Sequence, residues 1–335
     1  MYKTGKKEAV IIFIVLSLIS PFRLTGQESS GKMSEYIPDI DVILKTKLEH
    51  DLDNSLMRFE VRNARFGLRG KINEKMSYRT QLDLSDEGQM KMLDAYIRFT
   101  PVKNLDFYLG QRKIPFSTDY MRNPAENIFA NRSFLSKYIN NGLRDIGFFA
   151  SYKFSETLPV EIFAGAVNGT GNNNPQWISR PNFAGRILVG NEKGFRTAFN
   201  TYYGEAPDKI HLAMFGAEIR YATESFLIES EYIKRNWTDT LSFSQHDDGL
   251  YIHSYYHFPV RNELVKMITP VFRWDFTGSS IFSNNIDVNR LTIGFNTGFD
   301  SRPFYSEIRL NYENYFRGTL PIHTDKLTLE FIARF

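Results

Sequence analysis

Apolar and polar residues alternate along most of the chain, from about residue 38 to the last residue. The alternation is clearest in 75–84, 90–100 and 143–154, where every second side chain is apolar or weakly polar. A period of two predicts β-strands whose side chains point to opposite faces. Most of the segments are at least ten residues long, enough for a tilted strand to cross the hydrocarbon layer of a membrane. The sixteen predicted strands are 38–49, 56–71, 75–84, 90–100, 105–114, 143–154, 158–168, 181–190, 194–204, 209–221, 224–235, 248–259, 263–276, 287–299, 302–315 and 325–335.

The lengths of the connections separate two fold classes that share this alternation. Connections after even-numbered strands are all short, and every long connection follows an odd-numbered strand. Short turns at one end and long loops at the other are typical of bacterial outer-membrane barrels. A soluble Greek-key sandwich would scatter its long crossovers over both ends. We therefore predict an all-β fold, a transmembrane antiparallel β-barrel of about 16 strands. Its long connections are 115–142, 169–180, 236–247, 277–286 and 316–324.

The first 26 residues have the pattern of a secretory signal peptide. Three lysines precede an apolar run at 9–19, and Gly26 provides a small residue before a cleavage site at Gln27. An uncleaved membrane anchor is the alternative, but the run is much shorter than the ~20 apolar residues that a membrane helix needs. The prediction is a signal peptide over 1–26 and an outer-membrane barrel over 27–335.

Composition and charge agree with a barrel and restrict its partners. Aromatic residues make up 15% of the chain, yet its mean hydropathy is low, as expected for strands with one apolar and one polar face. The absence of cysteine excludes a disulfide framework and a thiol nucleophile. The signal segment holds four of the 41 basic residues and one of the 38 acidic residues, so 37 of each remain. A neutral mature chain gives no indication of nucleic-acid binding, and any preference for anions must come from the distribution of charge.

The connection 115–142 is too long to be a simple turn. From Arg112 to Arg144 the chain carries six basic residues and only two acidic ones, Asp119 and Glu126. We predict that this third loop folds into the lumen of the barrel, where it narrows the pore and attracts anions.

The last strand, 325–335, ends on an aromatic residue. Leu327, Leu329, Phe331 and Phe335 lie on one face of the predicted strand. A terminal aromatic residue that closes an alternating strand is the expected signal for the barrel assembly machinery, so we predict this partner to recognise Phe335.

Four segments make the chain resemble the phosphate-selective porin O and P family of Gram-negative bacteria. They are VRNARFGLRGKINEKMSYRTQLDLS (61–85), LDAYIRFTPVKNLDFYLGQRKIPFS (93–117), RNPAENIF (122–129) and LRDIGFFAS (143–151). The resemblance implies a sixteen-stranded barrel, usually a homotrimer, whose third loop folds inward. It also implies passive uptake of anions, with phosphate or polyphosphate as the solute, in an outer membrane of lipid and lipopolysaccharide.

Basic residues are the candidates for anion conduction, because arginine pairs two phosphate oxygens while it stays charged. A basic residue on a barrel can instead reach the membrane interface, pair with an acid or bind lipopolysaccharide. Acidic lumen candidates are Glu60, Asp83, Asp94, Asp106 and Asp145. The predicted constriction residues are Arg112, Lys113, Arg122, Arg132, Lys137 and Arg144, and the predicted lumen-wall residues are Arg58, Arg62, Arg65, Arg69, Arg79 and Arg98.

Two pairs of predicted lumen-wall residues would face opposite sides of one regular strand. Arg58 and Arg62 lie an even number of residues from Glu60, whereas Arg65 and Arg69 lie an odd number of residues from it. We therefore expect a β-bulge near Asn63 or Ala64, which would bring both pairs to the same face.

Other functions have weaker support. His253 and Ser254 are adjacent, so on a strand they face opposite sides and cannot form a catalytic dyad directly. His246 with Asp247 and Asp248 lacks the spacing of a metal site. We therefore predict no catalytic residue, metal or cofactor, and a porin for small anions. The alternatives are a general non-selective porin, a largely plugged structural or surface-interaction barrel and, less favoured, a barrel hydrolase.

Overall fold

A computed structural model describes residues 36–86, 88–139, 144–154, 157–206, 209–241, 243–299, 305–318 and 324–335. Residues Pro38–Phe335 form one compact unit, and of the separate unit Met1–Ile37 only residues 36 and 37 are described. The predicted signal peptide over 1–26 lies outside the described residues.

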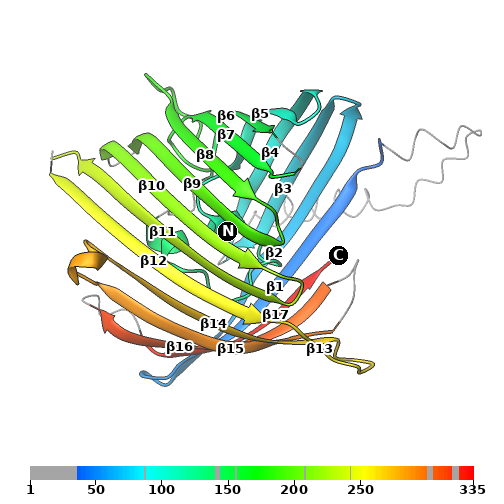
Figure 1. Cartoon of the computed structure of the whole chain (residues 1–335), viewed down its shortest axis with the longest axis vertical. Helices are drawn as coiled ribbons and strands as arrows, with labels where there is room; N and C mark the ends of the chain where they lie inside the picture. Colours follow the sequence, from blue (N-terminus) through cyan, green and yellow to red (C-terminus); the bar gives the residue numbers. More distant parts are fainter. Residues whose placement is uncertain are drawn as a thin grey trace, which may run out of the picture. The chain divides into compact units, whose positions relative to one another are not determined.

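One closed antiparallel sheet makes up the barrel (Figure 1). The two-residue β13 and the preceding β12 are both hydrogen-bonded to β14, so β12 and β13 count as one strand of the barrel. Counted in this way, the described barrel has sixteen strands. The strands are β1 (Asp39–Asp51), β2 (Leu56–Asn73), β3 (Met76–Asp86), β4 (Gln89–Val102), β5 (Leu105–Lys113), β6 (Arg144–Lys153), β7 (Val160–Val167), β8 (Asn182–Gly190), β9 (Gly194–Ala206), β10 (Lys209–Ala222), β11 (Phe226–Asp239), β12 (Ser244–Tyr256), β13 (Phe258–Pro259), β14 (Met267–Gly278), β15 (Val288–Gly298), β16 (Tyr305–Gly318) and β17 (Lys326–Arg334).

The barrel closes where the first and last strands meet. β1 pairs with β2 on one side and with β17 on the other. Beyond β17, the backbone of Phe335 exchanges two hydrogen bonds with Val42, at 2.8 and 3.1 Å. The terminal aromatic residue therefore lies at the seam of the closed sheet, and its side chain is exposed.

Alternation along the strands separates an apolar outer face from a polar inner face. In β10, Phe215, Ile219 and Tyr221 are exposed, whereas Glu218 is buried. In β17, Glu330 is fully buried between exposed apolar neighbours. A polar or charged residue that is buried on such a strand faces the interior of the barrel, while exposed apolar residues face outward.

The predicted strands agree with the observed ones in number and order, and two segments differ. The connection 236–247 is mostly strand, because β11 and β12 continue to pair from Asn236↔His246 to Thr238↔Ser244. The predicted strand 263–276 begins at Met267, after a turn closed by Val260 N donating to Lys266 O at 2.9 Å.

The expected bulge is confirmed one residue before its predicted place. The β1–β2 register moves from Thr46↔Val61 to Lys45↔Asn63, so Arg62 is the extra residue.

Within the described ranges, helical structure is confined to short pieces: α2 (Thr118–Met121), the π-turn η2 (Leu135–Ile139) and the 3₁₀ turn η3 (Ile281–Ser283). None of the helices in the described ranges is long and apolar enough to cross a membrane.

We predict that arginine on the outer face of β10 destabilises the barrel according to its depth. Phe215 lies at the middle of the strand and Tyr221 lies on the same face, one residue from its end. Phe215→Arg should lower the free energy of unfolding by about 2–4 kcal/mol, and Tyr221→Arg by about 0–1 kcal/mol, because a charge near the hydrocarbon midplane costs most. Urea unfolding of the protein in lipid vesicles measures both values, and equal losses would contradict the assignment of this face to lipid.

Candidate functional site

The connection between β5 and β6 holds the candidate site. Its described part, residues 114–139, is called the loop segment below. Backbone amides of the loop segment donate to inner-face side chains of distant strands. Ala130 N donates to Asn311 Oδ1 of β16, and Phe134 N donates to Asp275 Oδ2 of β14, both at 2.8 Å. The loop segment is therefore bonded to the wall on the side formed by the last strands.

Three buried arginines of that wall donate to backbone carbonyls of the loop segment. Arg273 Nη1 donates to Asn131 O at 2.9 Å, Arg290 Nη2 donates to Arg132 O at 2.8 Å, and Arg309 Nη2 donates to Ala125 O at 3.3 Å. Each guanidinium also pairs with inner-face carboxylates, such as Asp275 for Arg290 and Glu330 for Arg309. These contacts satisfy backbone groups that no secondary structure pairs.

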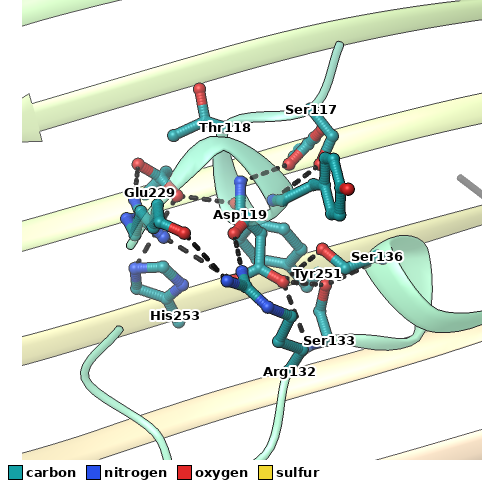
Figure 2. A network of polar contacts seen from close by, with 12 residues as sticks. Ser117, Thr118, Asp119, Arg132, Ser133, Ser136, Glu229, Tyr251 and His253 are labelled. Atoms are coloured by element: carbon teal, nitrogen blue, oxygen red, sulfur yellow. Dashed lines mark hydrogen bonds and ion pairs between the residues drawn. The ribbon is translucent and has the colours of Figure 1, made fainter. Parts of the chain in front are cut away.

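Asp119 is the centre of a second set of contacts, within the loop segment itself (Figure 2). Its Oδ2 accepts from Ser133 N at 3.1 Å, Ser133 Oγ at 2.8 Å and Ser136 Oγ at 2.6 Å. Arg122 lies 3.8 Å from its Oδ1, and Arg132 donates to its backbone carbonyl. The carboxylate thereby ties the start of the loop segment to its end.

The ionised form of Asp119 is favoured strongly. Burial would raise the pKa of this carboxyl, but the positive charges of Arg132 and Arg122 outweigh burial and hold the pKa below its ordinary value. The hydrogen bond from Ser136 acts in the same direction. The carboxylate is therefore charged throughout the physiological pH range.

β10 and β11, a nearby part of the wall, bind the loop segment through two further ion-pair groups. Arg122 pairs with the buried Glu229 of β11, whose Oε1 also accepts from Tyr251 Oη at 2.6 Å. Thr118 donates to Glu218 of β10, which pairs with Arg186 at 2.7 Å. The loop segment is thus held by β10 and β11 as well as by β14, β15 and β16.

Apolar packing completes the attachment. Ile114, Phe116, Leu135 and Ile139 of the loop segment are fully buried in one hydrophobic cluster with inner-face residues of the wall. Gly249 of β12 leaves room for it, since a Cβ there would come within 2.8 Å of Ile139 Cδ1.

A cavity of about 740 Å³ lies between the loop segment and the long-loop end of the barrel. Eleven basic side chains and three carboxylates line it, together with Tyr120, Asn127 and Phe134 from the loop segment. Its basic residues are Lys45, Lys47, Arg58, Arg62, Arg65, Lys91, Lys113, Arg132, Arg144, Arg290 and Lys326.

Two smaller cavities lie on the other face of the loop segment, toward the short turns. One of about 300 Å³ shares Arg65, Lys113 and Arg144 with the large cavity. It also shares Arg112 and Glu126 with a cavity of about 450 Å³, called the arginine cavity below. Basic residues therefore mark both boundaries between adjacent cavities along the lumen.

The predicted constriction residues have different surroundings. Lys113 Nζ donates to the carbonyls of Tyr120, Met121 and Arg122 at 2.7, 3.1 and 3.0 Å, so it binds the end of α2. Arg144 pairs with Asp94 at 2.8 Å. Arg122 and Arg132 serve the contacts described above. The side chain of Lys137 lies outside the described residues.

Arg112 differs from the others because it lies over four aromatic rings, those of Tyr96, Tyr108, Phe149 and Phe163. Its guanidinium carbon lies 4.0 Å from the ring centre of Tyr108 and 5.0 Å from that of Phe163. Its buried Nη1 has no hydrogen-bond partner among the described residues.

Five of the six predicted wall arginines pair with acids. Arg98 is exposed and donates to Ser77 Oγ at 3.0 Å. The pairs are Arg58–Glu49 at 2.5 Å, Arg62–Glu60 at 4.0 Å, Arg65–Asp83 at 2.8 Å, Arg69–Asp39 at 3.2 Å and Arg79–Asp94 at 3.1 Å. Only Arg58, Arg62 and Arg65 of this set line the large cavity.

Sequence reasoning missed the basic residues of the other strands. Arg273, Arg290 and Arg309 hold the loop segment, and Arg196 and Arg220 line the arginine cavity. A signal for the first group was available, since Arg273 and Arg309 each lie two residues from an acid on the same strand face.

The other candidate chemistry lacks support from geometry. His253 is buried against the Tyr251 ring, with ring centres 5.2 Å apart, and Asp247 pairs with Arg235 at 2.5 Å. Among the described residues, no group of three or more His, Asp or Glu side chains could hold a metal ion.

Solved structures with the same fold are outer-membrane barrels. The anion-selective porin from Comamonas acidovorans shares 10% identity, with 89% of this chain and 98% of that chain covered and a TM-score of 0.63. The channel DcaP of Acinetobacter baumannii shares 11%, with 93% and 100% covered and a TM-score of 0.58. The trimer form of OmpT from Vibrio cholerae shares 10%, with 89% and 99% covered and a TM-score of 0.59. At such identities the similarity shows the fold.

The chain is similar to outer-membrane porins in both sequence and fold. Residues 44–200 match the family model described as phosphate-selective porin O and P, which confirms the resemblance to this family. No curated protein matches the chain. The matched family is one of porins, and two of these structures are described as a porin and a channel.

We predict that Asp119→Asn loosens the loop segment. Removing one partner from a buried charged group costs about 3–5 kcal/mol, because the remaining charges lose their compensation. Single-channel recordings should show larger and noisier conductance than the unaltered protein. Asp39→Asn, which removes an exposed ion pair with Arg69, is the matched control and should leave conductance unchanged. Wild-type conductance in Asp119→Asn would contradict the anchoring role.

The same carboxylate sets an expected pH dependence. Folding lowers the pKa of Asp119, so its carboxylate stabilises the fold at every pH above the pKa in the unfolded chain, about 3.9 for Asp. This stabilisation is lost only as the pH falls from there through the lower pKa of the folded state. We therefore expect no acid-induced widening of the pore between pH 7 and pH 4. Conductance steps recorded across this range in constant salt test it, and widening near pH 5 would contradict it.

Proposed function

We propose that the chain is a passive channel for small anions, with the loop segment as an inward-folded constriction. The excess of basic side chains around the 740 Å³ cavity, eleven against three carboxylates, carries this proposal. A lumen lined by one sign of charge with low-dielectric walls raises the local concentration of the opposite ion. The two smaller cavities add the same sign of charge on the other face of the loop segment.

The fixed position of the loop segment explains how a neutral protein selects by charge. Its hydrogen bonds and ion pairs with β10, β11 and β14–β16 hold Arg132 at the large cavity. Lys113, the last residue of β5, lines both the large cavity and the cavity of about 300 Å³. Phosphate and polyphosphate are the candidate solutes suggested by the family description, and arginine-rich walls suit their oxygens.

Assembly and location follow the same reasoning. We propose export by the segment 1–26, insertion aided by recognition of Phe335, and a homotrimer in a membrane of lipid and lipopolysaccharide. The trimer form of a barrel with this fold supports the last point.

Reversal potential in a planar bilayer under a KCl gradient tests the proposal. We expect an anion-selective potential for the unaltered protein. Arg62→Gln and Lys326→Gln should each lower the permeability ratio of chloride to potassium about fivefold. A unit positive charge about 8 Å from an ion in water favours chloride by about 0.5 kcal/mol and disfavours potassium by about the same amount.

Lys193→Gln is the matched control, since Lys193 pairs with Glu224 on an exposed turn and lines none of the three cavities. Cation selectivity, or no preference, would overturn the anion channel in favour of a general porin. Absence of conductance would indicate a plugged structural barrel.

A further inference from the structure

The arginine cavity contains two arginines that face each other across neighbouring strands. Arg196 of β9 lies directly opposite Arg220 of β10 in the strand register. Side chains so placed have Cβ atoms about 5 Å apart, and like charges in this position destabilise a sheet. Both arginines line the cavity of about 450 Å³ on the short-turn side of the loop segment.

Neither arginine has a carboxylate partner within the described part of the chain. Arg196 has no hydrogen bond or ion pair there, and Arg220 donates only to the backbone carbonyl of Glu192, at 2.8 Å, while its Nε stays buried and unpaired. The cavity's two acids are engaged elsewhere: Glu126 lies 3.8 Å from Arg334, and Glu161 lies 3.8 Å from Lys153.

A third guanidinium joins this pair from β5, four strands away from β9 in the sheet. Arg112 lines the same cavity and has the unpartnered buried Nη1 described above. By contrast, Arg122 and Arg186 of this cavity are neutralised by Glu229 and Glu218. The structure therefore contains three guanidinium groups around one cavity that form no ion pair with the described residues.

The remaining wall of the arginine cavity is apolar and aromatic. Tyr108, Phe163, Leu188 and Met121 line it, and Arg112 stacks on the first two rings. A volume of about 450 Å³ lies within the range of pockets that hold small organic ligands, about 300–1,000 Å³. A bare inorganic ion would make no use of the apolar side chains of this wall.

We propose that the arginine cavity is a binding site for carboxylates that carry an aromatic ring. Arg196 and Arg220 hold the carboxylate, and the ring lies against Tyr108, Phe163 and the face of the Arg112 guanidinium. This site rests on the proposed anion channel, and it extends that proposal from inorganic anions to aromatic carboxylates.

The test compares two probes that have the same charge, benzoate and acetate. Inhibition of chloride current through the purified protein in a planar bilayer is measured against the concentration of each. We expect benzoate to halve the current at a concentration at least tenfold lower than acetate. The double variant Arg196→Gln/Arg220→Gln should bring the two concentrations to within about twofold of each other.

Two further variants separate charge from ring contact. Phe163→Leu keeps the arginines, so it should weaken inhibition by benzoate and leave inhibition by acetate unchanged. Arg98→Gln removes an exposed arginine that lines none of the three cavities, and it should behave like the unaltered protein. Gel mobility without heating checks that each variant is folded.

The outcomes distinguish this site from the anion channel on which it rests. Equal inhibition by both probes, with anion selectivity retained, would overturn the site and leave the channel. Inhibition by benzoate that persists in the double variant would place binding elsewhere and would also overturn it. Loss of anion selectivity in the unaltered protein would overturn both.

Discussion

The structure depends on satisfying the backbone of an irregular segment that is bonded to inner-face side chains of a closed sheet. The loop segment has only a short helix and a π-turn of its own, so most of its amides and carbonyls need other partners. Inner-face side chains supply them, with Arg290 and Asp275 each bonding one of its backbone groups. Asp119 closes the segment on itself. Without these contacts, the same residues would be a long, solvated surface loop.

This requirement explains why the arginines of the barrel have two roles. Arg273, Arg290 and Arg309 are fully buried, paired with acids and bonded to loop carbonyls, so they belong to the framework. Buried charges persist only when they are paired in this way. A second group lines the cavities: Arg62 and Lys326 line the large cavity, and Arg112, Arg196 and Arg220 line the arginine cavity. Arg196 and Arg220 have no carboxylate partner among the described residues. In the proposed anion channel, charge selection depends on the second group.

The order of the strands could be predicted from the sequence because a period of two is a local signal. The partner of each charge could not. Arg122 and Glu229 are 107 residues apart, and their meeting depends on strand register and on the path of the loop segment. The bulge at Arg62 shows the limit of local reasoning: the phase change is visible in the sequence, but the pairing of Arg65 with Asp83 is not. For the same reason the sequence predicts a loop over 236–247, although cross-strand pairing makes most of this segment strand.

Cross-linking the loop segment to the wall tests the central claim most directly. The chain contains no cysteine, so Ala130→Cys with Asn311→Cys gives a single possible disulfide where Ala130 N now donates to Asn311 Oδ1 at 2.8 Å. Oxidation of the folded protein in membranes should form this disulfide within the chain and leave the conductance close to that of the unaltered channel. A bulky thiol reagent that cannot enter the barrel provides the contrary result. If the disulfide does not form and this reagent readily labels the thiol introduced by Ala130→Cys, the loop segment is not held inside the lumen.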